Sequence, residues 1–177
     1  MFKRLLLTPL LCCAADPQIE VKAGYFLFSN ERMRTIYNSG GLDLQLSGSY
    51  PIWKWLQLYG SIEYLERSGR SLNWEQATQI WALPLSLGVK PVVAISSELD
   101  YYVTLGPRYF FFHQESHSTH GEKQVNENGL GGFINTGVQF FPTCSLLIDL
   151  FGEYSYKRFH SVQVGGFTFG GGIGYVF

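Results

Sequence analysis

The chain has little charge, few cysteines and no long hydrophobic run. Charged residues make up 15% of the sequence, well below the roughly 25% of an ordinary soluble domain. The 13 Lys and Arg residues nearly balance the 14 Asp and Glu residues, so no positive field favours nucleic acid as a partner. No segment has the roughly 20 apolar residues of a membrane-spanning helix. A helical membrane protein is therefore excluded.

The first 15 residues differ from the rest of the chain. Lys3 and Arg4 precede a short apolar stretch that ends in small residues at Ala14 and Ala15. A basic start, a short apolar core and a small-residue cleavage site are the parts of a secretory signal. We predict a cleavable signal peptide over residues 1–15 and a single mature domain over residues 16–177.

The three cysteines bear on the same segment. Cys12 and Cys13 lie inside the predicted signal peptide, so Cys144 would be the only thiol left and no internal disulfide is expected. A lipoprotein acylated at Cys12 or Cys13 is the alternative. The residues before them are large or are cysteine, whereas lipid attachment favours small ones, so an ordinary cleaved signal is preferred.

Aromatic residues and glycine are abundant, and they alternate along the end of the chain. Aromatics make up 16% of the sequence, and 20 residues are glycine. From Phe167 to Phe177 the odd positions are apolar and mostly aromatic, except Gly171, while the even positions are small. Alternate residues of a strand face opposite sides. This pattern is typical of a barrel wall with lipid outside and a crowded lumen inside.

The same period-two pattern occurs eight times along the chain. The predicted strands cover 19–28, 42–50, 55–66, 79–90, 97–112, 129–141, 145–157 and 165–177. Compact links alternate with four long polar ones, at 29–41, 67–78, 113–128 and 158–164. Short turns at one rim and long loops at the other are the arrangement of bacterial outer-membrane barrels. We therefore predict an all-β, eight-stranded, antiparallel up-and-down transmembrane β-barrel in the outer membrane, with four extracellular loops and both termini periplasmic.

A secreted, soluble eight-stranded barrel with an apolar cup would also alternate. Two features favour the membrane. Mid-strand charges fall on one set of alternate residues only, and aromatics of the other set gather near both rims. The short-turn rim is assigned Tyr50, Tyr101, Phe140, Tyr175 and Phe177, and the long-loop rim Tyr64, Trp81, Tyr109, Tyr156 and Phe167.

The charged set is predicted to face a lumen only wide enough for its own side chains. We expect Lys22 and Arg108 to be held among the acids, because an unpaired buried charge is costly. The result would be a structural plug, with a selective path for water or ions as the alternative and no wide pore. The predicted lumen network is Lys22, Asp43, Glu63, Asp100, Arg108, Asp149, Glu153 and Lys157, with Glu20 on the same face.

The third predicted loop carries residue types found in metal and catalytic sites. His113, His117 and His120 are weak metal-ligand candidates. Ser116 or Ser118 beside a histidine also suggests a nucleophile and base. Two acids lie nearby, but no second ligand cluster supports a metal site, the loop offers no scaffold to hold a site geometry, and Ser–His neighbours in a flexible segment are common by chance. We therefore predict no metal, no cofactor, no catalytic residues and no enzymatic activity.

Two surface features of the loops suggest partners. Basic residues just outside the membrane are placed to contact lipopolysaccharide phosphates; they are Arg32, Arg34, Lys157, Arg158 and His160. The run Phe110, Phe111, Phe112 is expected to extend its strand above the membrane, and an exposed sheet edge can pair with other strands. Such an edge is one physical route to adhesion on host or matrix molecules.

The carboxyl-terminal residues carry a resemblance to a known family. Gly172, Tyr175 and Phe177 match the assembly signal of small eight-stranded outer-membrane barrels, while Gly170 stands where that signal has a polar residue. The chain resembles the superfamily of opacity-type adhesins and OmpA or OmpX transmembrane domains, over roughly residues 18–177. The resemblance implies recognition by the barrel-assembly machinery and contact with outer-membrane lipid.

Three functions remain open at this point, because fold does not decide function. The leading one is a structural and interaction protein that displays loops for adhesion or envelope integrity. The second is a narrow channel or a conduit for hydrophobic solutes, as in OmpW-like barrels. The third is a lipid A-modifying membrane enzyme.

Overall fold

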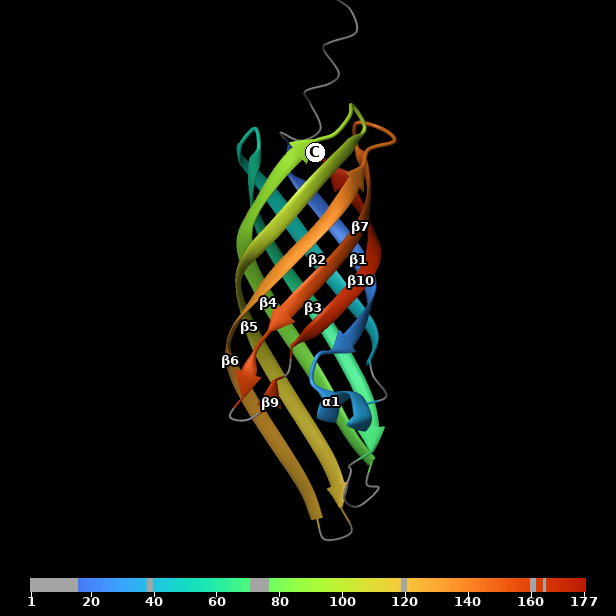
Figure 1. The fold of residues 1–177 in the computed structure, drawn as a ribbon, viewed down its shortest axis with the longest axis vertical. Helices are drawn as coiled ribbons and strands as arrows, with labels where there is room; N and C mark the ends of the chain where they lie inside the picture. The colour runs from blue at the N-terminus through green and yellow to red at the C-terminus, as the bar shows by residue number, and fades with distance from the viewer. Residues whose placement is uncertain (1–15, 38–39, 71–76, 119–120, 160–161, 164) are drawn as a thin grey trace, which may run out of the picture.

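Eight long antiparallel strands close into a barrel (Figure 1). The computed structural model describes residues 16–37, 40–70, 77–118, 121–159, 162–163 and 165–177. The predicted signal peptide, residues 1–15, lies outside this range. The wall strands are β1 (Gln18–Phe28), β2 (Gly40–Trp53), β3 (Leu56–Arg70), β4 (Ala77–Ala94), β5 (Leu99–Ser118), β6 (Gly121–Phe140), β7 (Leu146–Tyr156) and β10 (Gly166–Val176).

Three short elements lie at the long-loop end. The helix α1 (Glu31–Ile36) follows β1, and β8 (Arg158–Phe159) pairs with β9 (Val162–Gln163) as a separate two-stranded ribbon. Within the described ranges, no helix is long and apolar enough to cross a lipid bilayer.

The barrel closes between its first and last strands. β10 pairs with β1 on one edge and with β7 on the other, and every remaining neighbour follows chain order. Alternate side chains then face out or in: Leu87 and Leu150 are 66% and 67% exposed, whereas Ser86 and Asp149 are 3% and 0% exposed. The predicted eight-stranded antiparallel barrel is confirmed.

The short turns lie a few residues away from the predicted links. Pro51 and Pro91, which were expected to end their strands, instead lie inside β2 and β4. An irregularity in the β2–β3 register between Pro51 and Trp53 accommodates the first proline. A bulge lets a strand continue past a residue that has no N–H to donate.

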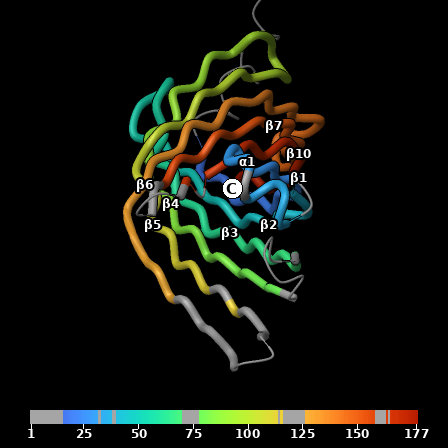
Figure 2. Tube along the Cα trace, turned by 60° about the horizontal axis from the view of Figure 1, so that its bottom comes forward, coloured from blue at the N-terminus to red at the C-terminus, as the bar shows by residue number. Residues whose placement is uncertain are grey.

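The predicted third loop was wrong over most of its length. β5 and β6 remain paired from His113 opposite Asn126 to Ser118 opposite Gly121. Residues 113–118 are all polar, so the sequence shows no apolar alternation there and predicts a loop. Figure 1 shows the β5–β6 hairpin reaching farther than β7 and β10 at the long-loop end, and Figure 2 shows β4, β5 and β6 as neighbours in the wall.

The predicted first loop contains an unexpected helix. The Asn30 carbonyl accepts a hydrogen bond from Arg34 N at 3.0 Å, and the Asn30 side chain accepts one from Met33 N at 3.4 Å. An asparagine is among the preferred N-caps, because its side-chain oxygen satisfies an otherwise unpaired N–H group. The cap starts α1, which lies at the same end of the barrel as the β5–β6 hairpin (Figure 1).

Candidate functional site

The lumen half nearer the short turns holds a buried cluster of two lysines and two acids. Lys22 Nζ lies 2.5 Å from Asp149 Oδ2 and 3.1 Å from Glu20 Oε2. Lys90 Nζ lies 3.5 Å from Glu20 Oε1. Tyr102 donates from its hydroxyl to Asp149 Oδ2 at 2.9 Å. All four charged side chains are almost fully buried, so the cluster fills the axis of the barrel with paired charge.

Lys90 was not among the predicted lumen residues. The sequence did indicate an inward side chain, because Lys90 is an even number of residues from Ser86 and Gly88, which were both predicted to face the lumen. A long cation at the predicted end of a strand was not counted as lumen. The structure extends β4 to Ala94 and so places Lys90 well within the barrel.

A second cluster, centred on Arg108, lies next to the first on the side of the long loops. Its guanidinium binds both oxygens of Glu63, with Nη1 at 3.1 Å from Oε2 and Nη2 on Oε1. Nη1 also lies 2.5 Å from Glu153 Oε1, and Nε donates to Ser86 Oγ at 2.7 Å. The guanidinium stacks 4.7 Å from the Phe133 ring centroid. Two carboxylates on one arginine satisfy most of its donors in a fixed geometry.

Two predicted network residues, Asp43 and Asp100, are buried in the lumen but belong to neither set of ion pairs, and a third, Lys157, is not in the lumen. Asp43 and Asp100 are each 5% exposed, and neither makes an ion pair with any described residue. Lys157 is a correction: its Nζ donates to the Leu130 carbonyl at 2.9 Å at an exposed position. It is the residue after the end of β7, where the chain has left the wall and inward parity no longer applies.

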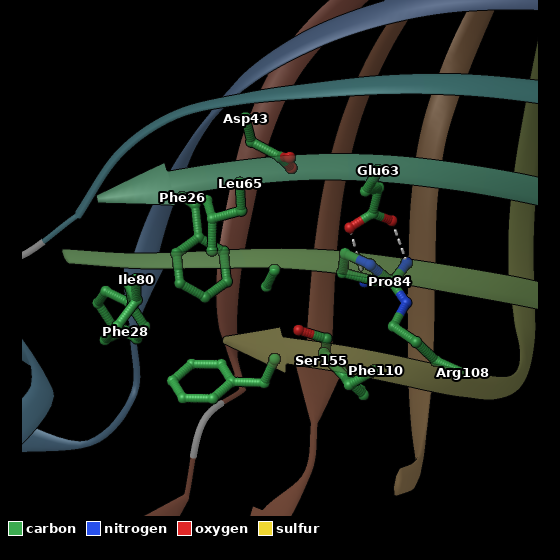
Figure 3. A pocket seen from close by; sticks show the side chains of 12 residues that line it. Phe26, Phe28, Asp43, Glu63, Leu65, Ile80, Pro84, Arg108, Phe110 and Ser155 are labelled. Atoms are coloured by element: carbon green, nitrogen blue, oxygen red, sulfur yellow. Dashed lines mark hydrogen bonds and ion pairs between the residues drawn. The ribbon is translucent and has the colours of Figure 1, made fainter. Parts of the chain in front are cut away.

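The lumen half nearer the long loops is apolar. Phe26, Phe28, Leu65, Ile80 and Phe112 pack together there with Met33 and Tyr37 of the α1 region. These walls and the Arg108 cluster enclose an apolar chamber (Figure 3), which leaves only ≈ 20 Å³ free for a water-sized sphere. The chamber is lined by Phe26, Phe28, Asp43, Glu63, Leu65, Ile80, Ala82, Pro84, Arg108, Phe110, Phe112 and Ser155. No simple sequence signal separated these inward aromatics from outward ones.

Two of the three histidine candidates, His113 and His117, lie on β5. The His113 ring stacks on Trp81 with centroids 5.3 Å apart. Its Nε2 bonds Glu115 Oε1 at 2.9 Å and its Nδ1 bonds Asn126 Oδ1. The hydrogen bonds to Glu115 and Asn126 raise the pKa of His113 above its ordinary value. Nothing in this arrangement leaves a ring nitrogen for a metal ion.

The other loop candidates cannot be placed fully. His120, His160 and the side chains of His117, Ser116, Ser118, Arg32 and Arg158 lie outside the described residues. Arg34 is exposed on α1. Among the residues that the structure describes, no group of three or more His, Cys, Asp or Glu side chains is arranged to hold a metal ion.

The proposed assembly-signal residues lie on the closing strand. Tyr175 and Phe177 point outward, 54% and 65% exposed, with ring centroids 5.1 Å apart. A Cβ on Gly172 would lie 2.8 Å from Lys22 Cγ. Glycine at this position therefore makes room in the lumen for Lys22.

The comparisons with known proteins agree on the fold. No known family model matches the chain, and no curated protein matches it in sequence. The solved structure of the outer membrane protein OprG from Pseudomonas aeruginosa superposes with a TM-score of 0.71 at 12% identity, covering 95% of this chain and 98% of OprG. Neisserial surface protein A gives 0.62 at 14% identity, covering 91% and 97%.

A third similar structure is Ail, the attachment invasion locus protein of Yersinia pestis, solved with the heparin analogue sucrose octasulfate. It superposes with a TM-score of 0.60 at 16% identity, covering 90% of this chain and 97% of Ail. At such identities the likeness concerns the fold, which spans almost the whole of each chain. This protein has the closed eight-stranded barrel fold of the small outer-membrane proteins.

Proposed function

We propose that this protein is a bacterial outer-membrane barrel with a closed lumen, and that it acts as a structural and interaction protein through its long-loop end. The observation that carries the proposal is the filled axis: Lys22, Lys90 and Arg108 are 0–1% exposed and bound to acids across the lumen. A barrel filled in this way transports no large solute. Its accessible features are the lipid-facing wall and the two rims.

The membrane setting follows from the outward face. Leucines cover the middle of the wall, with Tyr50, Trp53 and Trp55 exposed at the short-turn rim and Tyr64 and Trp81 at the long-loop rim. Aromatic belts at two levels suit the two interfaces of a bilayer. We place the termini in the periplasm and the hairpin outside the cell, with lipopolysaccharide around the wall. Gly172, Tyr175 and Phe177 would be read by the assembly machinery.

The β5–β6 hairpin is the proposed interaction element. The β6–β7 ladder ends at Gly132 opposite Tyr156, whereas β6 continues in its ladder with β5 out to Gly121. The hairpin thus extends beyond the level at which its neighbour β7 ends (Figure 1). A sheet extension of this kind presents backbone and polar side chains to molecules outside the cell.

Deleting residues 114–127 tests the interaction role. We expect the barrel to fold, because the deletion leaves the β4–β5 ladder intact from Trp81 opposite His113 to Ala94 opposite Asp100, and we expect binding to host cells or immobilised extracellular-matrix proteins to be lost. Folding is read from the heat-modifiable gel band, and binding from adhesion of bacteria that express each form. Lys54→Ala, at the opposite rim, is the control that should bind normally. A folded deletion that binds as well as the intact protein would remove the proposal.

Planar-bilayer recordings test the closed lumen. Because both charge clusters lie across the axis, we expect the purified barrel to show no stepwise ion conductance. A steady single-channel current from the heat-modifiable form would instead support the narrow-channel alternative.

A second function, a site for hydrophobic solutes, is favoured by a break in the wall. The β3–β4 ladder pairs Ile62 with Leu85 and resumes at Leu65 with Ala82, leaving out Pro84, which has no N–H to donate. Glu63 lines both the apolar chamber and an outward groove of ≈ 320 Å³ beside this break. The outward groove is lined by Val21, Leu44, Gln45, Leu46, Ile62, Glu63, Tyr64 and Leu83.

Neither function requires catalysis. We propose that the protein has no enzymatic activity, since the buried acids Glu63, Glu153 and Asp149 are held by cations.

A further inference from the structure

The floor of the apolar chamber is its end toward the short turns, formed by the Arg108 cluster. The acidic and basic side chains there carry more negative than positive charge. Three buried carboxylates, Asp43, Glu63 and Glu153, lie around one buried cation, Arg108. Arg67 lies near the long-loop end of β3 and is half-buried. Its guanidinium donates to the backbone carbonyls of Leu42 and Glu66. Even with Arg67 counted, one carboxylate has no balancing cation. A buried charge of this kind is costly unless a partner arrives.

Asp43 is the carboxylate of the three that makes no ion pair with a described residue. Arg108 makes its ion pairs with Glu63 and Glu153 and donates a further hydrogen bond to Ser86. Asp43 accepts a hydrogen bond from Thr168, but its Oδ1 has no hydrogen-bond partner among the described residues, although the residue is only 5% exposed. Asp43 also lines the chamber (Figure 3). An acceptor that is buried, charged and unpaired marks a place for a donor or a cation.

The walls decide which kind of cation would fit. Phe26, Phe28, Phe110 and Phe112 line the chamber together with Leu65 and Ile80. Aromatic faces attract organic cations. An apolar lining favours a cation whose charged nitrogen bears alkyl or aryl groups. A hydrated metal ion would find too few oxygens, and no described cluster offers three ligating side chains.

We infer that the chamber is a binding site for a small apolar organic cation, of the quaternary ammonium or lipophilic amine class, with Asp43 as its counter-ion. The inference rests on the second proposed function, that the chamber admits apolar solutes, and adds the charge of the solute. The cation would lie against Asp43 Oδ1, with its hydrocarbon part among the phenylalanines.

The roof of the chamber must open for such a ligand, since the free space now holds little more than a water molecule. The roof is the α1 region at the long-loop end, where Met33 and Tyr37 pack in one apolar cluster with residues that line the chamber. Tyr37 Oη lies 3.5 Å from Thr78 Oγ1, and its ring stacks on Phe28 at 5.8 Å. A six-residue helix is a small unit to displace. Entry through the long-loop mouth therefore needs no change in the wall.

The test compares two probes of nearly the same shape, benzyltrimethylammonium and the neutral neopentylbenzene. The full barrel is refolded in zwitterionic detergent micelles, and backbone amide shifts around Asp43 and Phe28 are followed by NMR as each probe is added. We expect saturable shifts with the ammonium at least about 10-fold tighter than with the hydrocarbon, because only the former has charge for Asp43 to neutralise.

Two variants of equal net charge locate the effect. Asp43→Asn should weaken the ammonium by at least about 10-fold and leave the hydrocarbon unchanged. Asp100→Asn removes a buried carboxylate at the short-turn end of β5, far from the chamber. It should change the affinity for neither probe. Equal binding of both probes by the intact protein would overturn the cation preference while leaving the apolar-solute function standing. If neither probe shifts the chamber amides, both the inference and that function fail. The comparison on the intact protein decides the matter even if Asp43→Asn does not fold.

Discussion

Replacing Arg108 by methionine should destabilise the folded barrel by about 3–5 kcal/mol. The substitution keeps an unbranched side chain of comparable length but leaves Glu63 and Glu153, which are 5% and 4% exposed, without their cation. Removing one partner of a buried ion pair costs more than the pair contributes, because the other charge stays desolvated. Guanidinium unfolding of the refolded barrel in lipid vesicles, followed by tryptophan fluorescence, measures the loss.

Compensating substitutions show whether Arg108→Met destabilises the barrel by leaving two acids unpaired or by removing packing contacts. Adding Glu63→Gln and Glu153→Gln to Arg108→Met removes the uncompensated charges, and we expect most of the lost free energy of unfolding to return. Lys157→Met is the matched control outside the lumen and should cost less than about 1 kcal/mol. If Arg108→Met proves no more costly than this control, the Arg108 cluster does not stabilise the barrel.

Replacing Leu87 by arginine should cost about 2–4 kcal/mol, the penalty for a cation in the middle of the lipid-facing wall. Leu87 lies on β4 between Trp81 at the long-loop rim and Val93 at the short-turn rim, and its side chain is 66% exposed. In water such an exposed side chain would tolerate arginine at almost no cost. The expected loss therefore reports hydrocarbon around the barrel rather than a change in packing.

Val93→Arg is the depth control on the same strand. Val93 is also well exposed, at 62%, but it lies at the rim, where an arginine should cost only about 0–1 kcal/mol. Unfolding of both variants in the same vesicles gives the comparison. Equal costs at the two depths would contradict a wall immersed in lipid.

Parity along each strand made most of the wall predictable. Glu20, Lys22, Asp43 and Glu63 all face the lumen, as their alternation with leucines and aromatics indicates. Parity also identifies Lys90 once β4 is known to continue to Ala94. It fails at Lys157, one residue past the end of its strand, because alternation carries information only while the chain remains in the wall.

The β5–β6 hairpin and α1 were missed for a related reason. Hydrophobic periodicity arises where one face of an element is buried and the other is not. The paired residues from His113 to Ser118 are all polar and lie at the long-loop end of β5, so their pairing leaves no such pattern. α1 has six residues, and its buried Met33, with Tyr37 just past its end, gives too few apolar positions to show a helical period.

The amino-acid sequence by itself determined that alternate residues face lipid and lumen, and therefore that the chain forms a closed barrel, because alternation is a local property of an extended backbone. Only the tertiary structure decided which charges meet. Lys22 and Asp149 are 127 residues apart in sequence, and their contact depends on the tilt and stagger with which the strands close. The same closure gave Arg108 two acids, left Asp43 without an ion pair to any described residue, and placed α1 at the long-loop end of the apolar chamber.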